Sequence, residues 1–154
     1  DEAQVIQGKG DRGWERVTIK DSESGELSAV LLAVGEMVAI LDRQYTTYSP
    51  TKCMEGLKIS DSKNCYTTPR NGRRGQTQLL EQLENKRTAP KVVMLRGDDS
   101  GKYETYDELV NAGRRRNHQR LYQAMTKVLP HQVVNLQFTS GTTGLPKAAM
   151  LTHQ

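Results

Sequence analysis

The sequence predicts an α/β fold in which a parallel-type sheet is flanked by helices. Short apolar segments that suit buried strands, at 37–41 and 91–95, are separated by segments whose apolar residues have helical spacing. The helix expected at 77–84 leads directly into the strand at 91–95, and this alternation is typical of α/β proteins. A length of 154 residues gives room for one domain with its own core.

The first forty residues are expected to supply two strands and one helix. Residues 1–13 are polar and contain several glycines, so we expect a frayed terminus there. The segment 14–20 alternates between apolar and polar residues and predicts a short strand. Helical spacing at 27–34 predicts a helix that ends at Gly35, and a buried-type strand is expected to follow at 37–41.

Between residues 42 and 76 the composition shifts to Thr, Ser, Asn, Gly and Arg, and no hydrophobic period is sustained. We therefore expect 42–76 to be irregular or poorly ordered. This segment contains both cysteines, Cys53 and Cys65, which do not form a Cys-x-x-Cys pattern. We interpret them as reduced thiols rather than as a disulfide.

Two further helices are expected between the strand at 91–95 and the end of the chain. Thr105 or Asp107 can cap the first, and the apolar spacing at 121–128 gives the second, which Pro130 ends. The last strand is predicted at 133–138 because its apolar residues alternate onto one face.

No segment of the sequence has the pattern of a membrane span or of a secretory signal. The longest apolar run, 29–34, is far shorter than the roughly 18 residues that a span requires. The first residues have neither a basic region nor an apolar one, although a removed signal stays open because the chain does not begin with Met. We expect a soluble, intracellular protein, and the sequence does not distinguish cytoplasm, mitochondrion and peroxisome.

A run of hydroxyl residues and glycines directly follows the last predicted strand. Hydroxyl groups and backbone N–H groups that turn inward together form a concavity suited to a phosphate chain, and glycine lets the backbone approach phosphate oxygens. A lysine at the end of the run adds a positive charge. The candidate phosphate-binding residues are Thr139, Ser140, Gly141, Thr142, Thr143, Gly144 and Lys147.

Two other interpretations of this run compete with the phosphate loop. The spacing from Gly141 to Lys147 matches the Walker A loop, but Pro146 stands where the second glycine is required. Ala148 also stands where a hydroxyl would hold Mg²⁺, so a P-loop NTPase is excluded at two positions. The other alternative, a surface hairpin without a ligand, is disfavoured by the length and order of the string.

The stretch 138–147, continuing through 148–153, resembles the phosphate-loop signature of the AMP-forming adenylate-forming enzymes. This superfamily contains acyl-CoA synthetases, luciferases and peptide-synthetase adenylation domains. Together with 135–138, the stretch is most similar to medium-chain fatty-acyl-CoA synthetases, and the segments 35–40 and 105–109 carry a weaker likeness.

The resemblance implies a partial N-terminal domain of an adenylate-forming enzyme over residues 1–154. Within this incomplete domain, 133–154 would contain a strand, the phosphate loop and the element that follows. The implied activity is an ATP-dependent acid–CoA ligase. The loop would hold the β- and γ-phosphates of MgATP while a carboxylate, expected to be a fatty acid, attacks the α-phosphorus. Coenzyme A would then displace AMP. The resemblance assigns no catalytic residue and no metal ligand to the chain.

The superfamily's other motifs lie downstream of the phosphate loop. Neither a Tyr-Gly-x-Thr nor a Thr-Gly-Asp string occurs among the 154 residues. We therefore expect the chain to be an N-terminal fragment, inactive alone because the adenine, ribose and C-terminal lysine motifs are absent. Whether the reading frame continues past Gln154, and whether 42–76 reflects a deletion, stay open, as do acyl chain length and oligomeric state.

Two non-catalytic alternatives stay open. One is a truncated regulator, which the sequence does not distinguish from the fragment. The other is a basic nucleic-acid-binding module, suggested by a net charge of +4 and by the arginines at 114–120. No known nucleic-acid motif or interleaved aromatic residue accompanies these arginines, which favours a solvated helix face. The three histidines, His118, His131 and His153, lack the neighbours that a metal site requires.

Overall fold

The computed structural model describes residues 16–20, 29–30, 39–71, 74–97, 100–115, 119–140 and 146–154. The main sheet contains β1 (Arg16–Lys20), β2 (Ile40–Arg43), β3 (Asn64–Thr67), β6 (Lys91–Met94), β7 (Glu104–Thr105), β8 (Val133–Ser140) and β9 (Pro146–Thr152). The helices are α3 (Pro50–Ser60), α4 (Thr77–Glu84), α5 (Tyr106–Arg114) and α6 (Gln119–Met125). Two short strands, β4 (Arg70–Asn71) and β5 (Arg74–Gly75), form a separate antiparallel pair.

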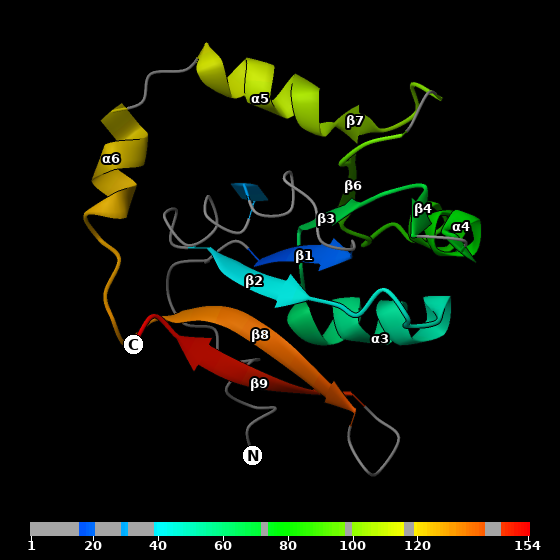
Figure 1. The fold of residues 1–154 in the computed structure, drawn as a ribbon, viewed down its shortest axis with the longest axis horizontal. Helices are drawn as coiled ribbons and strands as arrows, with labels where there is room; N and C mark the ends of the chain where they lie inside the picture. Colours follow the sequence, from blue (N-terminus) through cyan, green and yellow to red (C-terminus); the bar gives the residue numbers. More distant parts are fainter. Residues whose placement is uncertain are drawn as a thin grey trace.

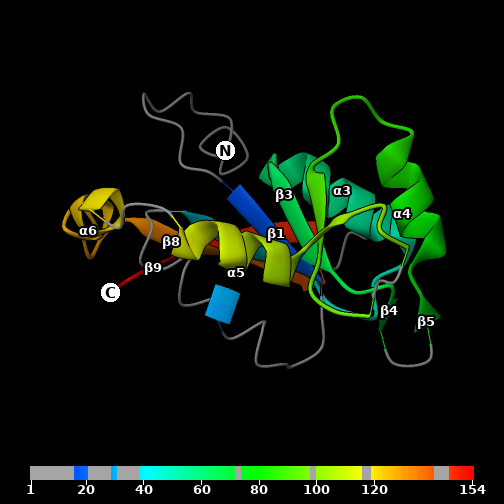
Figure 2. The same cartoon turned by 90° about the horizontal axis from the view of Figure 1, so that it is seen from above.

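The seven-stranded sheet has the order β7-β6-β3-β1-β2-β8-β9 (Figure 1). All neighbours are parallel except β8 and β9, which form an antiparallel hairpin at one edge. Figure 2 shows α5 crossing over the sheet, and Figure 1 shows α3 beneath the strands. The helix α4 packs with α3 against the same hydrophobic cluster. The predicted α/β class with a mostly parallel sheet and flanking helices is therefore confirmed.

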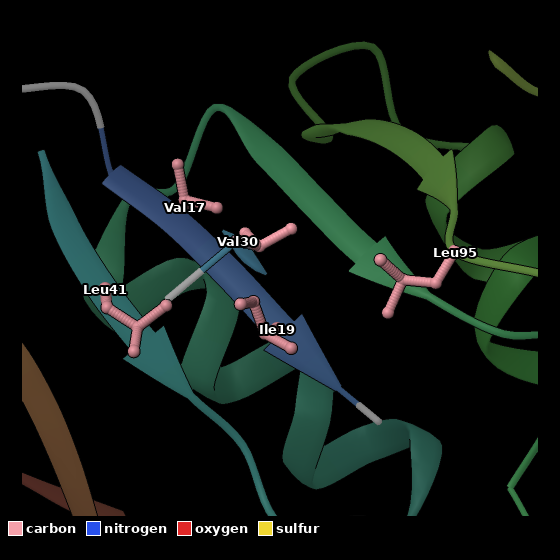
Figure 3. Packing of buried hydrophobic residues seen from close by; sticks show 5 residues of the cluster. All are labelled: Val17, Ile19, Val30, Leu41 and Leu95. Carbon is pink, nitrogen blue, oxygen red and sulfur yellow. The ribbon is translucent and has the colours of Figure 1, made fainter. Parts of the chain in front are cut away.

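Two hydrophobic clusters cover the opposite faces of the sheet. The first contains Val17, Ile19, Val30, Leu41 and Leu95 (Figure 3), with Tyr66 and Tyr106 packed against it. The second lies under α3 and α4 and contains Cys53, Leu57, Cys65, Leu79 and Leu83. The neighbouring β3 residues Cys65 and Tyr66 belong to different clusters because successive strand residues point to opposite faces.

Several predicted elements occur where the sequence placed them. The helix at 77–84 has the predicted bounds, and the strand expected at 14–20 is present as Arg16–Lys20. Thr105 caps α5 with a complete capping box, in which its side chain accepts from the Glu108 N–H. The segment 1–13 and most of the helix expected at 27–34 lie outside the described residues; of the latter, 29–30 are helical.

The expectation that 42–76 is irregular is wrong. This segment contains the eleven-residue helix α3 and the strand β3, which lies between β6 and β1. Ser49 caps α3 by accepting from the Lys52 N–H, Pro50 occupies the first turn, and Asp61 ends the helix in the left-handed conformation at φ 48°. The strand expected at 37–41 is also shifted, because β2 runs from Ile40 to Arg43. The hydrophobic pattern missed α3 because the helix buries small and polar residues.

A layer of buried polar side chains lies between the sheet and α3. Its centre is Asp42, whose Oδ2 accepts a hydrogen bond from Thr18 Oγ1 at 2.6 Å and another from Gln44 Nε2 at 3.2 Å. Thr18 Oγ1 also lies 2.7 Å from Ser62 Oγ, which lies 2.9 Å from Ser60 Oγ. These hydrogen bonds replace the water that the polar groups lose on folding, so they join β1, β2 and α3.

Burial raises the pKa of Asp42 from 3.8 to about 6, while its hydrogen bonds from Thr18, Ser60 and Gln44 act in the opposite direction. The second carboxylate oxygen, Oδ1, is buried and has no hydrogen-bond partner among the described residues. The charged form is therefore poorly compensated. The folded protein binds the proton of the Asp42 carboxyl more tightly than the unfolded chain does. Ionisation of Asp42 therefore lowers the stability of the folded protein as the pH rises from about 4 to about 6.

We predict that Asp42→Asn removes this pH dependence. The rise in the Asp42 pKa from 3.8 to about 6 corresponds to roughly 3 kcal/mol in the free energy of unfolding. Between about pH 4 and pH 7.5 the wild type should therefore lose most of this free energy relative to the variant. The measurement is urea unfolding of both proteins across this range, with Asp61→Asn, an exposed carboxylate at the end of α3, as the control. A constant difference between wild type and Asp42→Asn would contradict the prediction.

We also predict that Gly56→Ala destabilises the protein, although alanine normally favours a helix interior by about 1 kcal/mol. A Cβ at Gly56 would lie 2.6 Å from Gln44 Nε2, which is held by Asp42 Oδ2 and the Cys53 carbonyl. Giving up these hydrogen bonds should cost about 1–2 kcal/mol net, measured by urea unfolding. The matched control is Gly113→Ala in α5, where an added Cβ meets nothing within 4 Å. This substitution should stabilise the protein slightly.

Candidate functional site

The predicted phosphate loop joins the two strands of the β8–β9 hairpin. In the hairpin register, Thr139 pairs with Lys147 and Ser140 pairs with Pro146. The Thr139 hydroxyl also donates a hydrogen bond to the Lys147 carbonyl oxygen at 3.5 Å. Pro146 begins β9, a strand position that tolerates a residue without a backbone N–H. The structure thus brings the two ends of the predicted loop side by side.

Of the seven predicted phosphate-binding residues, the structure describes Thr139 and Lys147 in full and the backbone of Ser140. The side chains of Thr139 and Lys147 are both exposed. Gly141, Thr142, Thr143 and Gly144 lie outside the described residues. A hydroxyl and an ammonium group therefore flank the loop on adjacent strands, and both are available to a ligand outside the sheet.

The end of β8, the described strand that precedes the predicted loop, lies at the carboxyl ends of the parallel strands. Register pairs Arg43 with Gln137, so β8 continues three residues beyond the end of β2 before the loop begins. Open parallel sheets bind ligands outside the carboxyl ends of their strands. Figure 1 shows the end of β8 on this side of the sheet, next to the start of β9.

Alternate side chains of β8, the strand that precedes the loop, are buried in the core. Leu136 and Phe138 are 2% and 0% exposed, and Leu136 is the register partner of Asp42, so both side chains point to the face covered by α3. The intervening Gln137 and the following Thr139 point to the other face. The predicted inward face of this strand is thus correct for Leu136 and Phe138.

A tyrosine that the sequence did not single out as a site residue lies next to β8. The Tyr45 hydroxyl accepts a hydrogen bond from Gln137 Nε2 at 3.3 Å, and its ring centroid lies 5.3 Å from that of Tyr48. Lys52 Nζ lies 5.9 Å from the centroid of the Tyr48 ring. The segment between β2 and α3 is thus connected to the strand that precedes the loop. Hydrophobic periodicity does not indicate this contact, because Tyr45 falls in a polar stretch.

The remaining candidates from the sequence are dispersed. Arg114 and Arg115 are exposed at the end of α5, while Arg116 and His118 lie outside the described residues. The part of the chain that the structure describes contains no group of three or more His, Cys, Asp or Glu residues placed to hold a metal ion. It also has no helix of sufficient length and hydropathy to span a membrane.

Comparison with known proteins gives a family and a fold. The profile of the family described as AMP-binding enzyme matches residues 3–154. The acyl-CoA ligase sidI of Beauveria bassiana is 50% identical over 139 residues, covering 90% of this chain and 24% of that protein. The human mitochondrial medium-chain acyl-CoA ligase ACSF2 is 50% identical over 48 residues, covering 30% of this chain and 8% of that protein.

Among solved structures, the luciferase-like enzyme from the nonluminescent mealworm Zophobas morio superposes with a TM-score of 0.71 at 21% identity. The superposition covers 98% of this chain and 33% of that enzyme, and it shows a shared fold. The chain spans about a quarter of the length of the curated relatives that match most of its residues. The resemblance predicted from the loop signature is confirmed by these matches.

Proposed function

The chain belongs to the AMP-binding enzyme family, and on that premise we propose that residues 139–147 bind the β- and γ-phosphates of MgATP in an acid–CoA ligase. The observation that carries this proposal is the β8–β9 hairpin, which pairs Thr139 with Lys147 at the carboxyl edge of a parallel sheet. The exposed hydroxyl and ammonium groups suit an anion with several oxygens.

The proposed reaction has two steps. A carboxylate oxygen attacks the α-phosphorus of ATP, which forms an acyl-adenylate and releases pyrophosphate. The sulfur of coenzyme A then attacks the acyl carbon and releases AMP. Donors held at the loop before the reaction would stabilise the charge that develops on the departing pyrophosphate, at little cost in reorganisation. Bound Mg²⁺ supplies further neutralisation of the phosphate oxygens.

We propose a fatty acid as the carboxylate substrate. The support is the names of the relatives, which include acyl-CoA ligases and a medium-chain acyl-CoA ligase. The 154 residues contain no Tyr-Gly-x-Thr or Thr-Gly-Asp string for adenine and ribose. We therefore propose that these residues supply the phosphate-binding part of the site and require further segments for turnover.

We predict that Lys147→Ala reduces adenylation by about 10²–10³-fold in an enzyme that joins these residues to the remainder of an acyl-CoA ligase, because one preorganised cation is lost from the pyrophosphate. Ser140→Ala should reduce it less. The measurement is ATP–pyrophosphate exchange, with urea unfolding to check that the fold is intact. Lys58→Ala is the matched control. Lys58 is an exposed lysine in the last turn of α3, at the end of the helix that leads into the start of β3. Unchanged exchange in Lys147→Ala would refute the assignment.

We also predict that the purified 154-residue chain catalyses no ATP–pyrophosphate exchange with any carboxylic acid, because its sequence contains neither the Tyr-Gly-x-Thr nor the Thr-Gly-Asp string. The assay would use a panel of fatty acids of increasing length with MgATP and labelled pyrophosphate. A complete acyl-CoA ligase run in parallel shows that the assay works. Exchange above the no-enzyme rate that Lys147→Ala abolishes would show that the chain is competent alone.

A further inference from the structure

The polar layer under α3 contains a lysine and a cysteine in direct contact. Lys20 Nζ lies 2.9 Å from Cys53 Sγ, and the two residues are 2% and 0% exposed. Lys20 is the last residue of β1, and Cys53 lies in the first turns of α3. The contact therefore joins the central strand of the sheet to the helix that covers it.

Both partners are held in place by neighbouring backbone groups. Lys20 Nζ donates to the carbonyl oxygens of Tyr48 at 3.1 Å and Tyr45 at 3.3 Å. The Lys20 carbonyl accepts from the Thr67 hydroxyl at 3.1 Å, and the Cys53 N–H donates to the Ser49 carbonyl at 3.0 Å. The nitrogen and the sulfur are therefore held at hydrogen-bond distance in the folded protein.

We propose that Lys20 and Cys53 form a covalent nitrogen–oxygen–sulfur bridge when the protein is oxidised. The oxidant is dioxygen, which accepts four electrons from the thiol and the ammonium group. One oxygen atom becomes the bridge, with new S–O and O–N bonds, and the other leaves as water. The S–H bond and two N–H bonds break, and the remaining proton passes to solvent. The bridged pair therefore gains one oxygen and loses two hydrogens relative to the neutral thiol and amine.

The second cysteine supplies an internal comparison. Cys65 is 1% exposed and belongs to the same hydrophobic cluster as Cys53. Burial raises the pKa of the Cys65 thiol to about 12, and among the described residues no hydrogen bond joins its sulfur to an amine. Burial also raises the pKa of Cys53, but the hydrogen bond from Lys20 opposes that effect. Cys53 is therefore the thiol placed for this chemistry.

The bridge would remove the positive charge of Lys20 and leave a single N–H on its nitrogen. That N–H can serve one of the two tyrosine carbonyls, so the segment between β2 and α3 loses one anchor while β1 becomes covalently tied to α3. Reduction by two equivalents of a dithiol returns the thiol, the amine and water. This inference does not depend on the proposed ligase function.

The test is mass spectrometry of the full chain after exposure to oxygenated buffer, followed by alkylation under denaturing conditions and proteolysis. We expect a cross-linked peptide pair that contains Lys20 and Cys53, with one added oxygen and two fewer hydrogens, and its disappearance after dithiol treatment. Cys65→Ser is the matched control and should retain the cross-link. Cys53→Ser and Lys20→Arg, which keeps the cation, should lose it.

Two results would overturn the proposal. One is a Cys53–Cys65 disulfide, recognised by the loss of two hydrogens without added oxygen and by its persistence in Lys20→Arg. The other is alkylation of both thiols, or oxygen addition to Cys53 alone, after prolonged oxidation of the wild type. If Lys20→Arg fails to fold, the composition of the cross-link in wild type and Cys65→Ser still decides the question.

Discussion

Burial of the Asp42 carboxylate between the sheet and α3 is the constraint to which the surrounding residues conform. Thr18, Gln44 and Ser62 come from three separate parts of the chain and direct polar groups toward this layer. Gly56 leaves space for the Gln44 amide, so the helix can lie close to the strands. The position of α3 in turn covers the face of β8 that carries Phe138, which fixes the strand from which the loop departs.

Sequence patterns predicted the elements whose stability comes from large apolar residues. The helix Thr77–Glu84 buries Leu79 and Leu83 at helical spacing, and β8 buries Leu136 and Phe138 by alternation. The helix α3 instead buries Cys53, Gly56, Leu57 and Ser60, and its environment is a polar layer supplied by distant strands. Such burial leaves no hydrophobic period in the local sequence, so the pattern at 42–76 predicts irregular chain.

The same distinction, between local sequence patterns and contacts among distant residues, applies to the candidate site. The order of hydroxyls, glycines and lysine in 139–147 is a local property of the chain, so the loop could be recognised from the sequence alone. The contact between Tyr45 and Gln137 joins residues far apart in the chain and depends on the parallel pairing of β2 with β8. The approach of Lys20 to Cys53 likewise depends on how α3 lies across β1. Contacts of this kind follow from topology and not from spacing.

The pairing of β2 with β8 joins strands that are far apart in the sequence. It places Leu41 opposite Asn135, so the loop-bearing strand meets its partner only after the long intervening segment has been synthesised. Contacts between such distant residues form slowly, because the entropy of closing the loop must be overcome first. Because β8 is synthesised after β1, β2, β3 and β6, the outer edge of β2 has no partner strand until β8 emerges. That edge is then a transient site for pairing with other chains, and a chaperone that shielded it would protect the growing chain until β8 emerged.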